Sequence, residues 1–150
     1  MKVVTLDQLN ALKEFKVDIG LDSTVFHYGE NIEIKLTVKN ECKNTVRFLF
    51  ANPNNSFGPW ATSATLVDLN SKKSKLKYPS KAVLQSQIYF EEDLVNYYRY
   101  LKHGESISGT FNLMDIVILV DEDQILSKGK YELQLFFHSI ASNKLLFTVE

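Results

Sequence analysis

The chain has 150 residues, of which 45% are hydrophobic and 23% are charged, and its formal net charge is −1. This length fits one domain, and the composition excludes a disordered tail or a fibrous repeat. The near-neutral charge argues against a dedicated nucleic-acid-binding protein or a polybasic membrane protein, so we expect no nucleic-acid partner.

Cysteine usage and hydropathy indicate the compartment. Cys42 is the only cysteine, so no intrachain disulfide and no cysteine-rich zinc site can form, which fits a reducing environment. The first residues lack the apolar run of a signal peptide, and the longest apolar run, residues 116–120, is far below the ~20 residues of a membrane span. The sequence predicts a cytoplasmic protein with no membrane partner.

The only helical signal lies at the start of the chain. Thr5 and Gln8 have the spacing of a capping box, and leucines recur at helix-like intervals at positions 6, 9 and 12. We expect residues 1–14 to form a short helix that lies across one end of the domain. A frayed N-terminal arm is the alternative.

From Phe15 onward, apolar and polar residues alternate with a period of two, which is typical of half-buried antiparallel strands. The expected strands cover residues 15–21, 32–38, 46–50, 64–69, 76–78, roughly 82–89, 107–113, 131–137 and 145–149. Turn signals such as Tyr28-Gly29-Glu30 and Lys128-Gly129-Lys130 separate them. Residues 15–150 are therefore predicted to form a single all-β domain, an immunoglobulin-like antiparallel β-sandwich of seven to nine strands.

Three segments resemble known sandwich families. Gly29-Glu30 precedes an alternating strand that ends at Asn40, His103-Gly104-Glu105 precedes a second strand, and Gly129-Lys130-Tyr131 opens a third. This order resembles the small non-catalytic N-terminal domain of deuterolysin-type metallopeptidases. It is also similar to the intracellular proteinase inhibitor family. The resemblance spans roughly residues 15–150 and implies a sandwich fold, with protease inhibition as one function.

Recognisable catalytic patterns are absent from the sequence. No His-Glu-x-x-His motif occurs, so peptidase activity does not follow from the resemblance. Gly104-Glu105-Ser106-Ile107-Ser108 lacks the final glycine of a nucleophile elbow. The three histidines are far apart, and the acidic run at 121–123 fails the spacing of a calcium loop. We expect no enzyme activity, no cofactor and no structural metal.

Two segments are candidate binding sites because they concentrate aromatic residues. The first is the loop at 52–60, whose Asn-Pro start resembles a loop of chagasin-type protease inhibitors, and the second is the run at 97–100. Alternation allows only part of that run to face a core, and tyrosine and tryptophan dominate binding hot spots. The candidate residues are Asn52, Pro53, Phe57, Trp60, Tyr97, Tyr98 and Tyr100.

A lysine-rich stretch provides a competing candidate surface. Lys72, Lys73, Lys75, Lys77 and Lys81 occur with no acidic residue among them. They fit either a site for an anionic partner or, as we favour given the near-neutral total charge, lysines that protect an edge strand from pairing with other chains.

The sequence best fits a non-enzymatic protein-interaction module that binds another protein. One alternative is an intracellular protease inhibitor, and another is a carbohydrate- or small-ligand-binding sandwich, since exposed aromatic rings also stack on sugars. The oligomeric state stays open, a homodimer included.

Overall fold

The structure is a computed structural model that describes residues 2–6, 14–84 and 88–150. Strands dominate it, and the all-β prediction is confirmed. Within the described residues, the seven strands of five or more residues are β2 (Phe15–Leu21), β4 (Glu33–Asn40), β5 (Thr45–Leu49), β6 (Thr62–Asp68), β10 (Ser106–Asn112), β12 (Gly129–Phe137) and β13 (Ile140–Val149). The shorter strands are β1 (Val3–Thr5), β3 (Val25–Phe26), β7 (Lys73–Ser74), β8 (Leu76–Tyr78), β9 (Tyr98–Leu101) and β11 (Ile118–Leu119).

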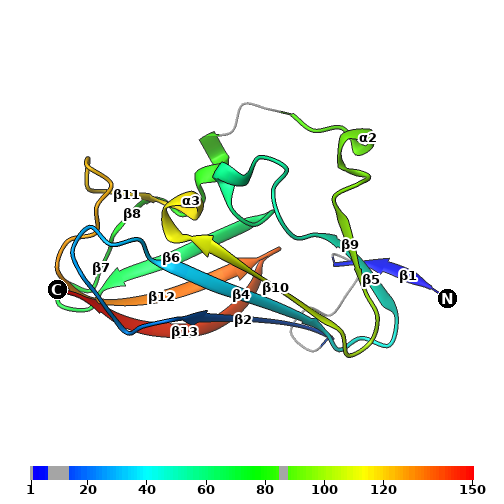
Figure 1. Cartoon of the computed structure of the whole chain (residues 1–150), viewed down its shortest axis with the longest axis horizontal. Helices are drawn as coiled ribbons and strands as arrows, with labels where there is room; N and C mark the ends of the chain where they lie inside the picture. Colours follow the sequence, from blue (N-terminus) through cyan, green and yellow to red (C-terminus); the bar gives the residue numbers. More distant parts are fainter. Residues whose placement is uncertain (1, 7–13, 85–87) are drawn as a thin grey trace.

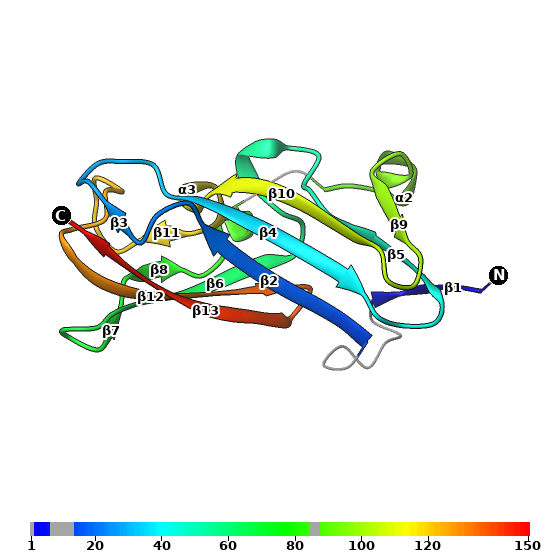
Figure 2. The ribbon, with the colours of Figure 1, turned by 60° about the horizontal axis from the view of Figure 1, so that its bottom comes forward.

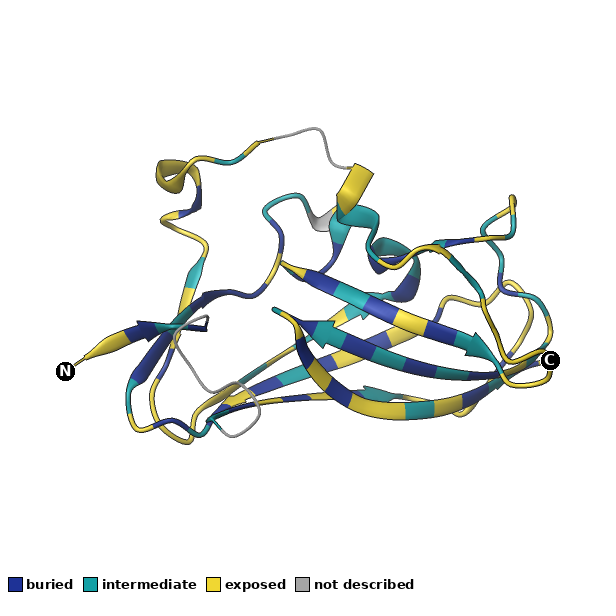
Figure 3. Cartoon of the chain, turned by 180° about the vertical axis from the view of Figure 1, so that it is seen from behind, coloured by how far each residue is buried: buried dark blue, intermediate teal, exposed yellow. Residues whose placement is uncertain are grey.

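Two sheets form the layers of the sandwich. One is antiparallel with strand order β10-β4-β2, and the other has the order β3-β13-β12-β6-β7 (Figures 1 and 2). Their facing side chains are apolar because alternate residues of each strand point inward, as the bands of buried and exposed residues in Figure 3 show. Ile34, Leu36 and Val38 of β4 are fully buried against residues such as Leu133 and Leu135 of β12.

A third, small sheet extends the molecule at one end. Its order is β1-β5-β9, and a two-stranded β11-β8 sheet lies toward the other end (Figure 1). β1 runs parallel to β5, and β3 runs parallel to β13, so the pairing is not purely antiparallel. Val4 and Leu6 at the N-terminus are buried in the core.

Helical structure in the described residues is confined to short turns. These are α2 (Glu91–Leu94), α3 (Leu113–Ile116) and two 3₁₀ turns at Asn55–Phe57 and Lys81–Leu84. The strand expected at 82–89 is wrong where the chain is described: Val83 and Leu84 lie exposed in a 3₁₀ turn, because no neighbouring strand pairs there. Of the residues 1–14 expected to form a helix, Val3–Thr5 form strand β1 instead, because they pair with β5, and residues 7–13 lie outside the described residues. No described helix is long and apolar enough to cross a membrane.

Both Gly-Glu pairs noted in the sequence form the same local turn. Gly29 and Gly104 adopt left-handed φ values of 84° and 81°, which glycine reaches without steric cost. The carboxylate of the following glutamate accepts a hydrogen bond from the backbone N–H three residues earlier, at 2.8 Å for Glu30 and 2.6 Å for Glu105. These motifs therefore have a local structural cause.

Tyr131 anchors the start of β12. Its side chain is fully buried, and its hydroxyl donates a hydrogen bond to the backbone oxygen of Ser127 at 2.6 Å. A buried tyrosine near the start of this strand that bonds back to the chain a few residues upstream is a tyrosine corner, a hallmark of immunoglobulin-like sandwiches. This hydrogen bond fixes the position of the loop before β12 relative to the strand.

We expect Tyr131→Phe to lower the free energy of unfolding by about 0.5–1.5 kcal/mol, because it removes a hydrogen bond to the partly buried Ser127 carbonyl. Urea denaturation of the purified protein measures the change. Tyr97→Phe is the matched control: its ring is exposed, so the change stays within about 0.5 kcal/mol of wild type. Equal stabilities of the Tyr131 variant and wild type would contradict the role of the corner.

Candidate interaction surface

A buried asparagine fixes the end of the sandwich where the small sheet begins. The chain reverses twice there, between β4 and β5 and between β9 and β10. The Asn40 amide nitrogen donates to the backbone oxygens of Asn44 and Leu101, both at 2.8 Å, and its amide oxygen accepts the Cys42 N–H at 2.8 Å. One fully buried side chain thus joins both reversals.

The segment at residues 88–100 runs outside the core toward the two chain reversals that Asn40 joins. It includes α2 and ends in β9, and Figure 1 shows it above the small sheet. Most of its large apolar side chains face solvent, and Figure 3 shows the region mostly in the colour of exposed residues. The exposed fractions are Ile88 77%, Phe90 65%, Val95 60%, Tyr97 45% and Tyr100 56%.

Anchoring contacts hold the 88–100 segment in place. Leu94 is buried, and the rings of Tyr89 and Trp60 lie 5.9 Å apart. At the start of α2 the Asp93 carboxylate accepts the Phe90 N–H at 2.9 Å, which caps the turn. The backbone at Phe90 is therefore ordered while its side chain is exposed.

Tyr98 is held by two charged neighbours. Its hydroxyl donates to the Glu91 carboxylate at 3.0 Å, and the Arg47 guanidinium lies 4.5 Å from the centre of its ring. Partial burial raises the pKa of Tyr98 above its usual value of 10.0, and the hydrogen bond and charge of Glu91 raise that pKa further. Tyr98 therefore links α2 to β5 and β9.

A groove of about 440 Å³ has Tyr98, Arg47, His138 and Ser139 among its lining residues. The Nε atom of Arg47 is buried and has no hydrogen-bond partner in the described part of the chain.

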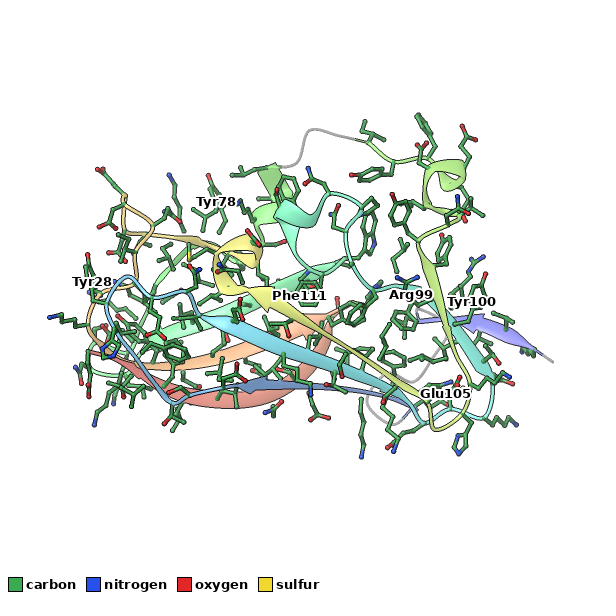
Figure 4. All side chains as sticks on the ribbon, in the orientation of Figure 1. Tyr28, Tyr78, Arg99, Tyr100, Glu105 and Phe111 are labelled. Atoms are coloured by element: carbon green, nitrogen blue, oxygen red, sulfur yellow. The ribbon has the colours of Figure 1, made fainter. Side chains whose placement is uncertain are left out.

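The tyrosines of the run at 97–100 differ in their exposure to solvent. Tyr97 and Tyr100 are exposed, whereas Tyr98 is half-buried. Figure 4 shows Arg99 and Tyr100 on opposite sides of β9, as alternation along a strand requires. Tyr97 and Tyr100 are therefore the members of this run that are available to a partner.

The loop at 52–60 folds back on itself. Asn52 is buried, and its N–H donates to the Gly58 oxygen at 3.0 Å, while Trp60 N–H donates to Phe50 at 2.9 Å. Pro53, Phe57 and Trp60 are half-buried. The contact of Trp60 with Tyr89 brings this loop to the start of the 88–100 segment, and not to the predicted site at 97–100.

Ile88 and Val95 belong to the surface although the sequence interpretation did not name them, and Phe90, noted there only among the aromatic residues, belongs to it as well. The alternation at 82–89 suggested a strand, which would have buried part of this stretch. The signal that could have identified the surface is the acidic run of α2 between these apolar residues, because three successive carboxylates keep the flanking chain at the protein's exterior.

The lysine-rich stretch is divided among structural roles. Lys73 lies in β7, the edge strand of the five-stranded sheet, where lysine opposes pairing with other chains. Lys75 is largely buried and forms an ion pair with Asp121 at 3.1 Å. Lys77 lies 5.8 Å from the centre of the Tyr78 ring.

Cys42 and His103 lie together without forming a thiol–imidazole pair. The His103 ring nitrogen contacts the Cys42 backbone oxygen at 3.1 Å, whereas the buried sulfur accepts the Asn44 N–H at 3.2 Å. In the described residues no group of three or more histidines, cysteines and carboxylates is arranged to hold a metal ion.

We expect Glu91→Gln to lower the pKa of Tyr98 toward its usual value, without reaching it because burial remains. A raised pKa in the fold means that the neutral phenol contributes stability below pH ~10, which is lost as pH rises through the folded pKa. NMR titration of ring-labelled Tyr98 measures the shift. Glu92→Gln is the control because Glu92 makes no hydrogen bond to Tyr98, and an equal shift in both variants would contradict the assignment.

Comparison with known proteins adds only fold-level information. No family model matches the chain, and no curated protein matches it. Among solved structures, a β-glucosidase from Listeria innocua, in complex with laminaribiose or with glucose, is 16% identical over 91% of this chain with a TM-score of 0.50. The sporulation control protein Spo0M from Bacillus subtilis is 18% identical over 91% of this chain and 49% of its own, with a TM-score of 0.40.

The chain spans only 16% of the β-glucosidase's length. At this identity the likeness shows a shared fold alone. The fold is thus that of an all-β sandwich that also occurs as a small part of a larger protein.

Proposed function

We propose that the protein is a non-enzymatic protein-binding module whose docking surface is the 88–100 segment. The observation that carries the proposal is the exposure of large apolar side chains on an anchored backbone. Of the fourteen exposed large hydrophobic residues in the described chain, five lie in the 88–100 segment. Clusters of this kind mark interaction sites, whereas single exposed apolar residues are ordinary.

Burial energetics support a protein as the occupant. Covering a side chain such as Phe90 or Ile88 contributes about 1.5–3 kcal/mol, and a partner's apolar surface supplies that cover. The anchored backbone lowers the entropy cost of binding because the segment is already ordered.

The acidic residues of the 88–100 segment indicate which charges a partner protein would carry. The carboxylates of Glu91, Glu92 and Asp93 lie between the exposed Phe90 and Val95. A complementary surface would therefore present an apolar patch flanked by lysine or arginine side chains. The lone Cys42 favours a reducing compartment, so the proposal assigns the interaction to the cytoplasm. Protease inhibition and sugar binding stay predictions from the sequence.

The proposal predicts that Phe90→Ser combined with Val95→Ser weakens partner binding by at least about 30-fold in Kd, which corresponds to ~2 kcal/mol at a hot spot. Partners are captured from native lysate with the wild-type protein, and each is then purified and titrated by calorimetry. The Kd of the purified pair, and not capture itself, is the measurement.

The matched control is Leu146→Ser combined with Val120→Ser, since both residues are exposed apolar positions away from the segment. Lys73→Ala serves as a charge control, whereas Lys75→Ala is unsuitable because it breaks the ion pair with Asp121. All variants are first compared with wild type by thermal unfolding. Binding that survives the Phe90/Val95 change, or that falls equally in the control pair, would overturn the proposal.

A further inference from the structure

One strand of the sandwich has an outer edge with nothing paired to it. β10 is the last strand in the order β10-β4-β2, and Figure 2 shows no strand beyond it. An unpaired edge presents free N–H and C=O groups that can bind another strand. We infer that the outer edge of β10 pairs with β10 of a second copy of this chain to form a symmetric dimer.

The hydrogen-bonding parity of β10 identifies the free groups. Asn40 N–H donates to the Glu105 oxygen at 3.0 Å, and Leu113 N–H donates to the Ile32 oxygen at 2.9 Å. Odd-numbered residues of this stretch therefore bond to β4. Because alternate residues of a strand point to opposite edges, the backbone groups of Ser106, Ser108 and Thr110 point away from β4. No backbone partner meets them in the described part of the chain.

The other edge of the same sheet confirms this parity. Glu41 N–H donates to the Glu14 oxygen, so the even-numbered residues of β2 bond to β4 and the odd-numbered ones point outward. The outward groups of Ile19 are both occupied: its N–H donates to the Asn143 side chain at 2.7 Å, and its oxygen accepts from it at 3.0 Å. At this edge a side chain takes the place of a neighbouring strand.

β10 carries none of the usual defences of an edge strand. Its residues include no charge and no proline, and its register with β4 shows no bulge. By contrast, Lys73 occupies β7 at the edge of the other sheet. Ser106, Ser108 and Thr110 are exposed but small and neutral, so a strand can approach them closely.

The free groups are self-complementary, which favours a second copy as the occupant. In antiparallel pairing about Ser108, Ser108 faces its own counterpart, and Ser106 faces Thr110 of the second copy. The outward groups of Ser106, Ser108 and Thr110 then all have partners, and each of these pairs exchanges both backbone hydrogen bonds.

Side chains fit the same register. Ile107, on the inner face, would face the second copy's Gly109 and lie beside the Phe50 and Phe111 rings that pack over that glycine. On the outer face, Lys35 and Lys39 of the two β4 strands would be about 14 Å apart, three strand spacings, beyond the Debye length of ~8 Å at physiological salt. No like charges meet across the axis.

Sedimentation equilibrium over a dilution series, together with hydrogen exchange by NMR, tests the inference. We expect the mass to rise with concentration from 17.2 kDa to twice that value. The N–H groups of Ser106, Ser108 and Thr110 gain protection as the dimer forms, whereas those of Ile107, Gly109 and Phe111 are protected throughout. A wild-type chain that stays monomeric, or a dimer that leaves these three N–H groups unprotected, would overturn the inference.

Ser108→Lys supplies the variant test because it places two ammonium groups opposite each other at the axis. We expect it to remain a monomer at concentrations where wild type is dimeric, with the protection of Ile107 and Gly109 showing that it is folded. Thr65→Lys, on the exposed face of β6, is the matched control and stays dimeric. A dimeric Ser108 variant, or a monomeric Thr65 variant, would contradict the assignment. The test does not involve the 88–100 segment, so its outcome is independent of the proposed function.

Discussion

The amide of Asn40 is the constraint on which the arrangement of the two ends depends. A fully buried polar side chain destabilises a protein unless its donors and acceptor are satisfied, and all of them are satisfied here by backbone groups. Those groups belong to both chain reversals. The end of β4, the start of β5 and the end of β9 are therefore fixed relative to one another, and the small sheet takes a defined direction from the sandwich.

That direction places the candidate surface. β9 carries Tyr98 and Tyr100, and Tyr98 joins α2 through Glu91 and β5 through Arg47. The exposed residues of the 88–100 segment thus belong to a backbone whose direction is set by the hydrogen bonds of Asn40. A second asparagine, Asn143, closes the opposite edge at β2, so amide side chains act at two places where strand pairing ends. β10 lacks such a closure.

The long strands could be predicted from the sequence because each has a core on one side and alternates accordingly. The burial of Asn40 could also have been predicted, because it continues the alternation by which Ile34, Leu36 and Val38 point inward. A polar side chain at such a position needs buried hydrogen-bond partners. The 3₁₀ turn at Lys81–Leu84 could not, since alternation there resembles a strand, and only the absence of a pairing neighbour prevents one. The exposure of Phe90 and Val95 depends on tertiary structure in the same way.

The central role of Asn40 is tested most directly by backbone hydrogen exchange of the Asn40→Ala variant. Asn143→Ala is the matched control, because it also removes one amide side chain. Our account predicts faster exchange in β5 and β9 of the Asn40 variant, while β12 and β13 keep their protection. In the Asn143 variant the faster exchange is confined to β2 and the adjoining part of β13. Unchanged exchange in β5 and β9 after loss of the Asn40 amide, or the same changes in both variants, would contradict it.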